Sequence, residues 1–150
     1  MINVFEHPEF KDHQEIHFFQ DRETGLKAII AIHFLLEGTA GGGCRFYPYA
    51  GSEEALTDVL RLSRTMTYKF ILANVPMGGA KSVIIGNPQK HKTEALLESF
   101  GEKIDELNGK YIVGPDVGSN ENDMSVIRRR TQYAAGAKET GGNTAPMTGY

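Results

Sequence analysis

The sequence predicts an α/β domain of three layers, in which a mixed β-sheet is flanked by helices and an opening β-hairpin lies at the sheet's edge. Three observations carry this prediction. The chain has 150 residues, about the length of one domain. Two strand-like segments at its start flank a short turn. From residue 44 onward, short apolar strand patterns alternate with helical ones, as in α/β domains.

The opening hairpin is predicted from two segments rich in β-branched and aromatic residues. Residues 14–22 and 26–35 are its strands, and Glu23-Thr24-Gly25 between them ends in a glycine that suits a tight turn. The stretch 38–43 is so rich in glycine that we expect no regular element there. A strand then resumes over 44–47.

The clearest helix begins at Ser52, whose side chain we expect to cap it, while two glutamates in the first turn complement the helix dipole. Apolar residues then recur at spacings of three and four as far as Phe70, which predicts a helix with one face toward a core. Pro76 and Gly78 end this helix before a short buried strand over 82–85.

The second half of the chain repeats the alternation of strand and helix. Asn87-Pro88 interrupts the chain, and residues 92–108 then carry a second helical pattern that Asn108-Gly109 closes. A brief strand is expected over 111–113. Another helix is expected over 122–130, whose three final arginines suit the negative end of its dipole.

Composition excludes several classes of protein. A net charge of −3 argues against a nucleic-acid or anionic-membrane surface, and 40% hydrophobic residues exclude a largely disordered chain. The lone Cys44 cannot form an internal disulfide. The N-terminus has no signal-peptide pattern, and the most apolar run, Ala28 to Leu36, is about half of the ~20 residues that a membrane span needs. We therefore expect a cytoplasmic protein.

The 17 glycines gather at 41–43, 78–79 and 141–142, which raises the question of phosphate binding. A P-loop needs lysine directly after its last glycine and a helix next, but Ala80 precedes Lys81 and a strand pattern follows. A dinucleotide fingerprint fails as well, because glycines 41 and 43 are not followed by one at position 46. Two interpretations remain: close approach of backbone to backbone, or a ligand against bare backbone.

Two lysines and one aspartate favour the ligand. Helical spacing places Lys69 on or beside the apolar face of its helix, and Lys81 lies between a double glycine and an apolar strand. Two partly buried lysines lower each other's pKa, and a lysine with a lowered pKa can act as a general base. Asp116, between Pro115 and Gly118, is a natural acidic partner. The residue types predict a site for a small anionic substrate; a snorkelling lysine and an aspartate in a turn are the structural alternatives.

The same residues carry a resemblance to a known family. The motifs are G-G-C-R at 42–45, M-T-Y-K at 66–69, G-G-A-K-S-V-I-I-G at 78–86, L-N-G-K-Y-I at 107–112 and P-D-V-G at 115–118. In order and spacing they resemble the N-terminal domain of the glutamate/leucine/phenylalanine/valine dehydrogenases. Tyr-Pro-Tyr at 47–49 and Asp-Val-Leu-Arg-Leu-Ser at 58–63 are most similar to the leucine, phenylalanine and valine branch.

The resemblance implies NAD-linked oxidative deamination of a branched-chain or aromatic L-amino acid to its 2-oxo acid. It implies that Lys69 pairs with the substrate carboxylate, that Lys81 is the general base that activates water, and that Asp116 exchanges the proton of the substrate amine beside the nicotinamide. No metal site is expected.

The resemblance also implies the residues that surround the substrate and the cofactor. Gly42 and Gly43 would line the substrate, Met66 would shape the pocket for its side chain, and Arg45 and Thr148 would lie near NAD. Two positions depart from the family pattern, since Gly41 and Phe46 replace a bulky aliphatic residue and a methionine. We expect Gly41 to enlarge or reshape the pocket so that it admits an aromatic substrate, and Phe46 likewise argues against leucine itself.

One domain of the family has no counterpart in this sequence. The dinucleotide-binding Rossmann domain would begin about where the chain stops, so residues 1–150 are expected to be the substrate-binding and oligomerisation domain, inactive alone. The alternative is a stand-alone module for assembly or amino-acid binding. In either case we expect a homo-oligomer, at least a dimer, joined through the exposed edge of the hairpin.

Overall fold

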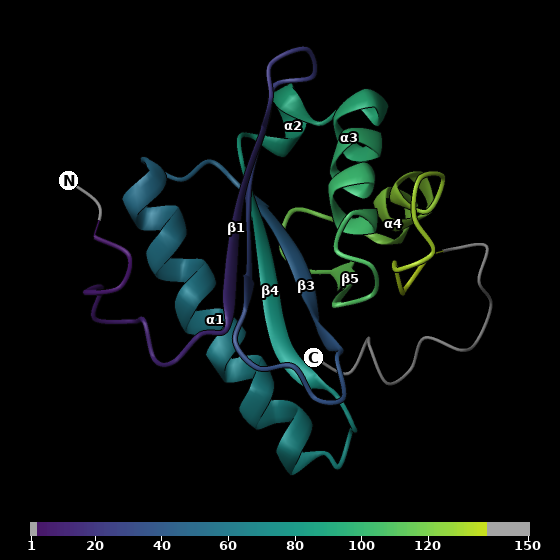
Figure 1. Cartoon of the computed structure of the whole chain (residues 1–150). Helices are drawn as coiled ribbons and strands as arrows, with labels where there is room; N and C mark the ends of the chain where they lie inside the picture. Colours follow the sequence, from purple (N-terminus) through teal and green to yellow (C-terminus); the bar gives the residue numbers. More distant parts are fainter. Residues whose placement is uncertain (1–2, 138–150) are drawn as a thin grey trace.

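The computed structural model describes residues 3–137, and Figure 1 shows their arrangement. The chain begins with a hairpin, followed by a third strand, a long helix and then two further strands separated by helices. The elements in order are β1 (Glu15–Asp21), β2 (Leu26–Ile32), β3 (Ala40–Tyr47), α1 (Ser52–Leu72), β4 (Gly78–Ile85), α2 (Pro88–His91), α3 (Glu94–Asp105), β5 (Tyr111–Pro115) and α4 (Glu121–Ile127).

The five strands form one mixed sheet in the order β1-β2-β4-β3-β5. β1 pairs antiparallel with β2 and β2 antiparallel with β4, whereas β3 is parallel to both β4 and β5. The hairpin therefore lies at one edge, as the sequence predicts. The parallel half brings the carboxyl ends of β3, β4 and β5 to the same edge of the sheet, where ligands of α/β domains commonly bind.

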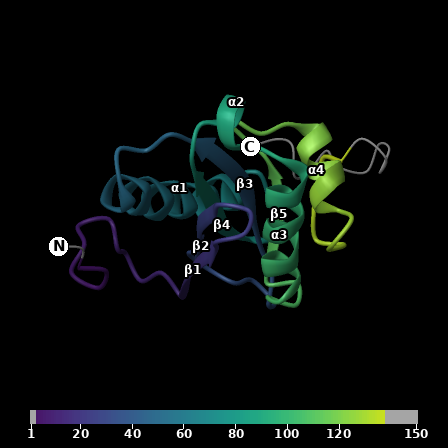
Figure 2. The same cartoon turned by 90° about the horizontal axis from the view of Figure 1, so that it is seen from above.

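Helices cover both faces of the sheet, which confirms the three layers (Figures 1 and 2). One core lies between the sheet and α1, around Leu56, Leu60 and Val83. The larger core lies between the opposite face and α3 and α4, around Phe46, Phe100 and Ile127. None of the helices described between residues 3 and 137 is long and apolar enough to cross a membrane.

Three local predictions were wrong. The glycine-rich stretch 38–43 is not wholly irregular, because β3 begins at Ala40 and runs through the three glycines. Ser52 does not cap α1: Gly51 is the N-cap and no side chain bonds there. The predicted helix over 122–130 ends early: α4 stops at Ile127, and the three arginines lie beyond its last turn. Arg129 and Arg130 instead form ion pairs with Glu98 of α3, at 3.0 and 2.7 Å, and so join the two helices.

The segment before β1 is held against α1 by two histidines. His13 accepts a hydrogen bond from the Lys11 N–H at Nδ1 and donates from Nε2 to the Leu60 carbonyl, 2.8 Å away. His33 donates from Nε2 to the Lys11 carbonyl, and its Nδ1 bonds the Thr67 hydroxyl at 2.8 Å. The His13 ring is neutral, because its Nδ1 accepts from a backbone N–H. Burial lowers the pKa of each below the usual 6.5.

Because the pKa values of His13 and His33 are lowered in the folded protein, we expect the protein to lose stability in mild acid. In the unfolded chain both take up a proton near pH 6.5, whereas in the folded protein their lowered pKa values delay this. Below pH 6.5 the unfolded state thus binds more protons, and the free energy of unfolding falls as the pH drops toward the folded pKa values. Urea unfolding at about pH 8 and about pH 5.5 measures the loss. An NMR titration in which His13 protonates at or above 6.5 contradicts this account.

Candidate active site

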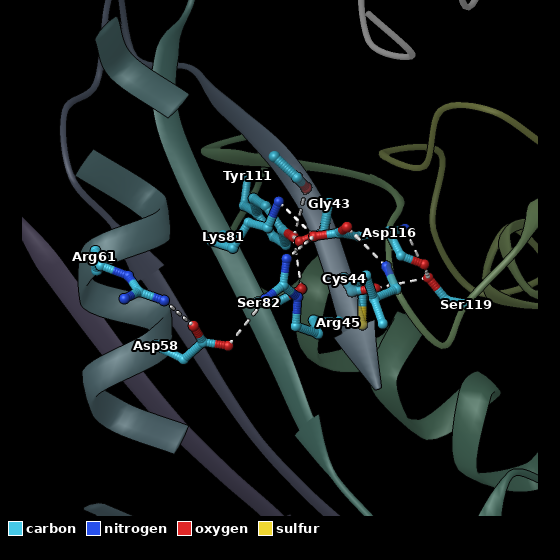
Figure 3. A network of polar contacts seen from close by, with 12 residues as sticks. Gly43, Cys44, Arg45, Asp58, Arg61, Lys81, Ser82, Tyr111, Asp116 and Ser119 are labelled. Atoms are coloured by element: carbon cyan, nitrogen blue, oxygen red, sulfur yellow. Dashed lines mark hydrogen bonds and ion pairs between the residues drawn. The ribbon is translucent and has the colours of Figure 1, made fainter. Parts of the chain in front are cut away.

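The centre of the candidate site is an ion pair between β4 and the loop after β5. The Lys81 Nζ lies 2.6 Å from the Asp116 Oδ2. The Lys81 side chain is only 6% exposed and that of Asp116 18% exposed, so the pair is largely shielded from water. Figure 3 shows the two side chains directed toward each other across β3. The structure thus brings together the two residues for which the sequence predicts catalytic roles.

The surroundings of the pair lower the pKa of both groups, the amine of Lys81 and the carboxyl of Asp116. Burial lowers the pKa of Lys81 from the usual 10.5, although the hydrogen bond and charge of Asp116 oppose this; Arg45 and Lys69 lower it further. Burial disfavours the Asp116 carboxylate, but Lys81, the Val117 N–H and Arg45 together lower its pKa. A buried amine with a lowered pKa, held at a fixed acceptor, can take a proton from water.

The Asp116 loop is held by hydrogen bonds within itself and to β3. The Val117 N–H donates to the Asp116 Oδ1 at 2.7 Å, and the Asp116 N–H donates to the Ser119 hydroxyl. Ser119 in turn donates to the Cys44 carbonyl on β3, at 2.7 Å. The loop is therefore joined to the strand that runs between Lys81 and Asp116.

The glycines bring strands and helix unusually close. A Cβ added at Gly42 would overlap the carbonyl oxygen of Ala80 on β4, and one added at Gly79 would overlap the backbone of Thr67 on α1. The Tyr111 hydroxyl donates to the Gly42 carbonyl at 2.8 Å and bonds the Ser82 hydroxyl at 2.6 Å. Close approach of the chain's own backbone thus explains Gly42 and Gly79, the structural interpretation that the sequence leaves open.

The other predicted site residues differ in their exposure to solvent. Met66 and Lys69 lie one turn apart on α1, and Met66 is buried. Lys69 is exposed, so the expectation that it is partly buried is wrong. Gly43 lies in β3 beside Gly42, with its carbonyl 3.4 Å from the Tyr111 hydroxyl. Thr148 lies outside the described residues.

Phe46, the second departure from the family pattern, does not face this site. Its side chain is 1% exposed and packs in the core on the side of α3 and α4. Side chains alternate along a strand, and the neighbouring Arg45 contacts α1 on the opposite face. Lys81 lies two residues before Val83 on β4, so the two side chains share a face of the sheet. Val83 packs against α1, and Lys81 therefore also faces α1. Phe46 and Lys81 therefore point to opposite faces of the sheet.

Arg45 has partners that the sequence did not reveal. Its Nη1 lies 3.3 Å from the Asp58 Oδ2 on α1, and its Nη2 lies 3.6 Å from the Asp116 Oδ2. Asp58 also accepts from the Tyr49 hydroxyl at 2.6 Å. A cavity of about 510 Å³ opens beside them, lined by Arg45, Tyr47, Tyr49, Asp58, Arg61 and Val117 among others. Tyr-Pro-Tyr and Asp58 stood out in the sequence only as marks of a family branch.

An α/β domain that holds a buried lysine in the middle of one strand, beside an aspartate at the carboxyl end of another, has the groups of a proton-transfer site. The model of one protein family, "Glu/Leu/Phe/Val dehydrogenase, dimerisation domain", matches residues 12–133. The chain belongs to this family.

Individual relatives agree with this assignment. Over 99% of its length the chain is 46% identical to leucine dehydrogenase from Geobacillus stearothermophilus, of which it covers 41%. It is 48% identical to phenylalanine dehydrogenase from Caldalkalibacillus thermarum, with 90% of this chain and 37% of that protein aligned. The crystal structure of L-tryptophan dehydrogenase from Nostoc punctiforme superimposes with a TM-score of 0.79 at 46% identity, over 82% of this chain and 37% of the other. The chain thus spans about two fifths of the length of these relatives.

Proposed function

We propose that this chain is the substrate-binding and catalytic half of an NAD-dependent L-amino-acid dehydrogenase that converts a branched-chain or aromatic L-amino acid to its 2-oxo acid. The observation that carries the proposal is the buried ion pair of 2.6 Å between Lys81 and Asp116. The names of relatives with 44–48% identity support the substrate class, since they are dehydrogenases of leucine, phenylalanine, tryptophan and valine.

In the proposed reaction the substrate loses a hydride from Cα and one proton from its ammonium group, which leaves an iminium ion. Asp116, an ionised carboxylate, accepts the ammonium proton. Lys81, as the neutral amine, takes a proton from water while the water oxygen bonds to the iminium carbon. The carbinolamine then releases ammonia and becomes the 2-oxo acid. Burial favours the neutral amine of Lys81 that such a base needs, and the cations around Asp116 keep its carboxyl group ionised against the effect of burial.

The remaining predicted residues would hold the substrate. The exposed ammonium of Lys69 can pair with the α-carboxylate without the cost of burying two charges beforehand. Its charge acts on Lys81, so the two lysines belong to one electrostatic environment. Gly42 and Gly43 would lie against the substrate backbone, and Met66 against its side chain. This arrangement would place the amine toward Asp116.

NAD would accept the hydride in this reaction, a role for it that rests on the family. Among residues 3–137 both glycine clusters lie inside strands, and neither opens a helix as a dinucleotide fingerprint does. These residues therefore do not fit the pyrophosphate of a dinucleotide. Arg45 and Asp116 would face only the nicotinamide end, and Thr148 remains a proposed contact.

Binding to the chain itself tests the proposal. We expect calorimetry to detect binding of at least one branched-chain or aromatic L-amino acid or its 2-oxo acid. We expect Lys69→Ala to weaken this binding about 10- to 100-fold, because a charge-assisted hydrogen bond to the carboxylate is lost. Lys90→Ala, which removes an exposed lysine of α2, is the control and leaves the affinity unchanged. If Lys69→Ala binds as the parent protein does, Lys69 is not the carboxylate partner.

We also propose that two copies of the chain associate through the β1 edge. The family model describes a dimerisation domain, and β1 is the outermost strand next to β2, with Phe18 55% exposed on it. Light scattering should therefore show at least a dimer, and Phe18→Glu should shift it to the monomer, because a charge at an edge strand opposes pairing. Leu72→Glu is the matched control, since Leu72 is 85% exposed at the end of α1. If Leu72→Glu dissociates the oligomer and Phe18→Glu does not, the interface lies at α1 and not at β1.

A further inference from the structure

A chain of alternating charges runs from the surface of α1 to the buried lysine (Figure 3). The Arg61 Nη2 lies 3.0 Å from the Asp58 Oδ1, and the Arg45 Nη1 lies 3.3 Å from the Asp58 Oδ2. The Arg45 Nη2 then lies 3.6 Å from the Asp116 Oδ2, which is 2.6 Å from the Lys81 Nζ. Three cations and two carboxylates therefore alternate, and the two carboxylates share Arg45 between them.

We propose that Asp58 is a positioning residue for the Lys81–Asp116 pair, because it holds Arg45 on the side of α1 and so leaves the Asp116 oxygen to Lys81. The catalytic meaning of this role rests on the function proposed above. The contacts themselves do not, since they are made within the chain without substrate.

The distances show an unequal division of Arg45. It forms a hydrogen bond to Asp58, whereas its separation from Asp116 is that of an ion pair alone. Lys81, in contrast, lies within hydrogen-bonding distance of Asp116. The same oxygen of Asp116 faces both cations, so a movement of Arg45 toward it would compete directly with Lys81.

Asp58 is well anchored for this task. Its Oδ2 accepts a bond of 2.6 Å from the Tyr49 hydroxyl, and its Oδ1 accepts from Arg61. Its side chain is only 13% exposed, so its attraction for Arg45 is less screened by water than that of a surface pair. Burial raises the pKa of Tyr49, and Asp58 raises it further, so this hydroxyl remains a hydrogen-bond donor at neutral pH.

Loss of the Asp58 charge has a definite expected consequence. In Asp58→Asn, Arg45 keeps Asp116 as its remaining carboxylate in the chain of charges and moves toward it. The ammonium of Lys81 then shares its counter-charge with a guanidinium and is less stabilised. Among the residues that the structure describes, Asp116, Arg45 and Lys69 are charged groups that act on Lys81, and of these three Arg45 is the one that Asp58 contacts. The pKa of Lys81 should therefore fall in Asp58→Asn and rise in Arg45→Gln.

NMR titration of the Lys81 ammonium, in protein labelled at the lysine Nζ and assigned with Lys81→Ala, tests this in the chain itself. We expect Asp58→Asn to lower the pKa by about one unit, a tenfold change in the proton affinity of the amine. In a protein that already carries Arg45→Gln, we expect Asp58→Asn to leave the pKa of Lys81 unchanged, because Asp58 acts on Lys81 through Arg45. Glu54→Gln is the matched control, because Glu54 lines the same cavity one turn before Asp58.

The outcomes separate cleanly. A Lys81 titration that is the same in Asp58→Asn as in the parent protein overturns the proposal. The proposal also fails if Asp58→Asn shifts the pKa of Lys81 equally in the parent protein and in Arg45→Gln. It fails likewise if Glu54→Gln shifts this pKa as much as Asp58→Asn does. Either result would show a general electrostatic effect of lost negative charge, not an effect of the position of Arg45. If the predicted cycle is found but no L-amino acid or 2-oxo acid binds, the positioning role stands and the proposed function fails.

Discussion

Lys81→Ala is expected to lower the rate of amino-acid oxidation by about 10²- to 10⁴-fold, the usual loss when a general base is removed. The amine is buried and 2.6 Å from Asp116, so no other group of the described site occupies its position as a base. The fold should survive, because Asp116 keeps the Val117 N–H and Arg45 as partners. Under the proposed function the assay also needs a nucleotide-binding domain, and joining the chain to the remainder of the Geobacillus stearothermophilus leucine dehydrogenase provides one.

A second lysine provides the control for this variant. Lys92 forms a comparable ion pair with Asp123, at 2.7 Å and with its side chain 19% exposed, but on the side of α4. Lys92→Ala should cost stability and leave the rate intact. If calorimetry shows that Lys81→Ala collapses the domain, the lysine is structural and its catalytic role is not supported.

Gly79→Ala is expected to destabilise the protein by about 3 kcal/mol or more, the upper range for an overpacked core. Its Cβ would overlap the Thr67 nitrogen and hydroxyl and approach the Ser63 carbonyl, all on α1. It would also disturb the hydrogen bond from the Gly79 N–H to the Thr67 hydroxyl, at 3.1 Å. Because most of these atoms are backbone, the helix must move as a whole. Thermal unfolding should shift down by about 6–12 °C for a chain of this size.

Gly51→Ser is the contrasting variant. A Cβ at Gly51 meets nothing within 4 Å, and a serine at this N-cap position can bond a free N–H of α1. We expect its melting temperature to equal or exceed that of the parent protein. A Gly79→Ala protein that melts with the parent would mean that α1 does not pack against β4 as described.

Most of the fold was predictable because its signals are local. The periodic apolar residues of α1 and α3 and the β-branched strands of the hairpin lie where the sequence predicts them. The three glycines of β3 were not recognised as a strand, since glycine has little preference for one. Their strand is imposed by pairing with β4 and β5 on either side, which is tertiary information. The arginines after α4 were misinterpreted for the same reason, because their partners lie on α3.

The site residues, too, were only partly predictable from the sequence. Lys81 and Asp116 could be singled out from the sequence, because a charged residue between glycines and an apolar strand is unusual. Their distance could not be predicted, since 35 positions of chain separate them and the sheet order brings them together. Asp58 and Tyr49 stood out only within motifs of a family branch. The contacts of Asp58 with Arg45 and with Tyr49 could not be predicted, because an aspartate on a helix and a tyrosine after a proline have many ordinary uses.

The protonation of Lys81 is the most direct test of the account, since a base must be neutral to act. The measurement is the NMR titration of its ammonium in the parent protein, with and without a saturating branched-chain or aromatic 2-oxo acid. The account predicts a pKa below 10.5 in the free protein and a change on binding. A pKa at or above 10.5 that is unaffected by these acids would contradict it, because Lys81 would then be a structural cation paired with Asp116.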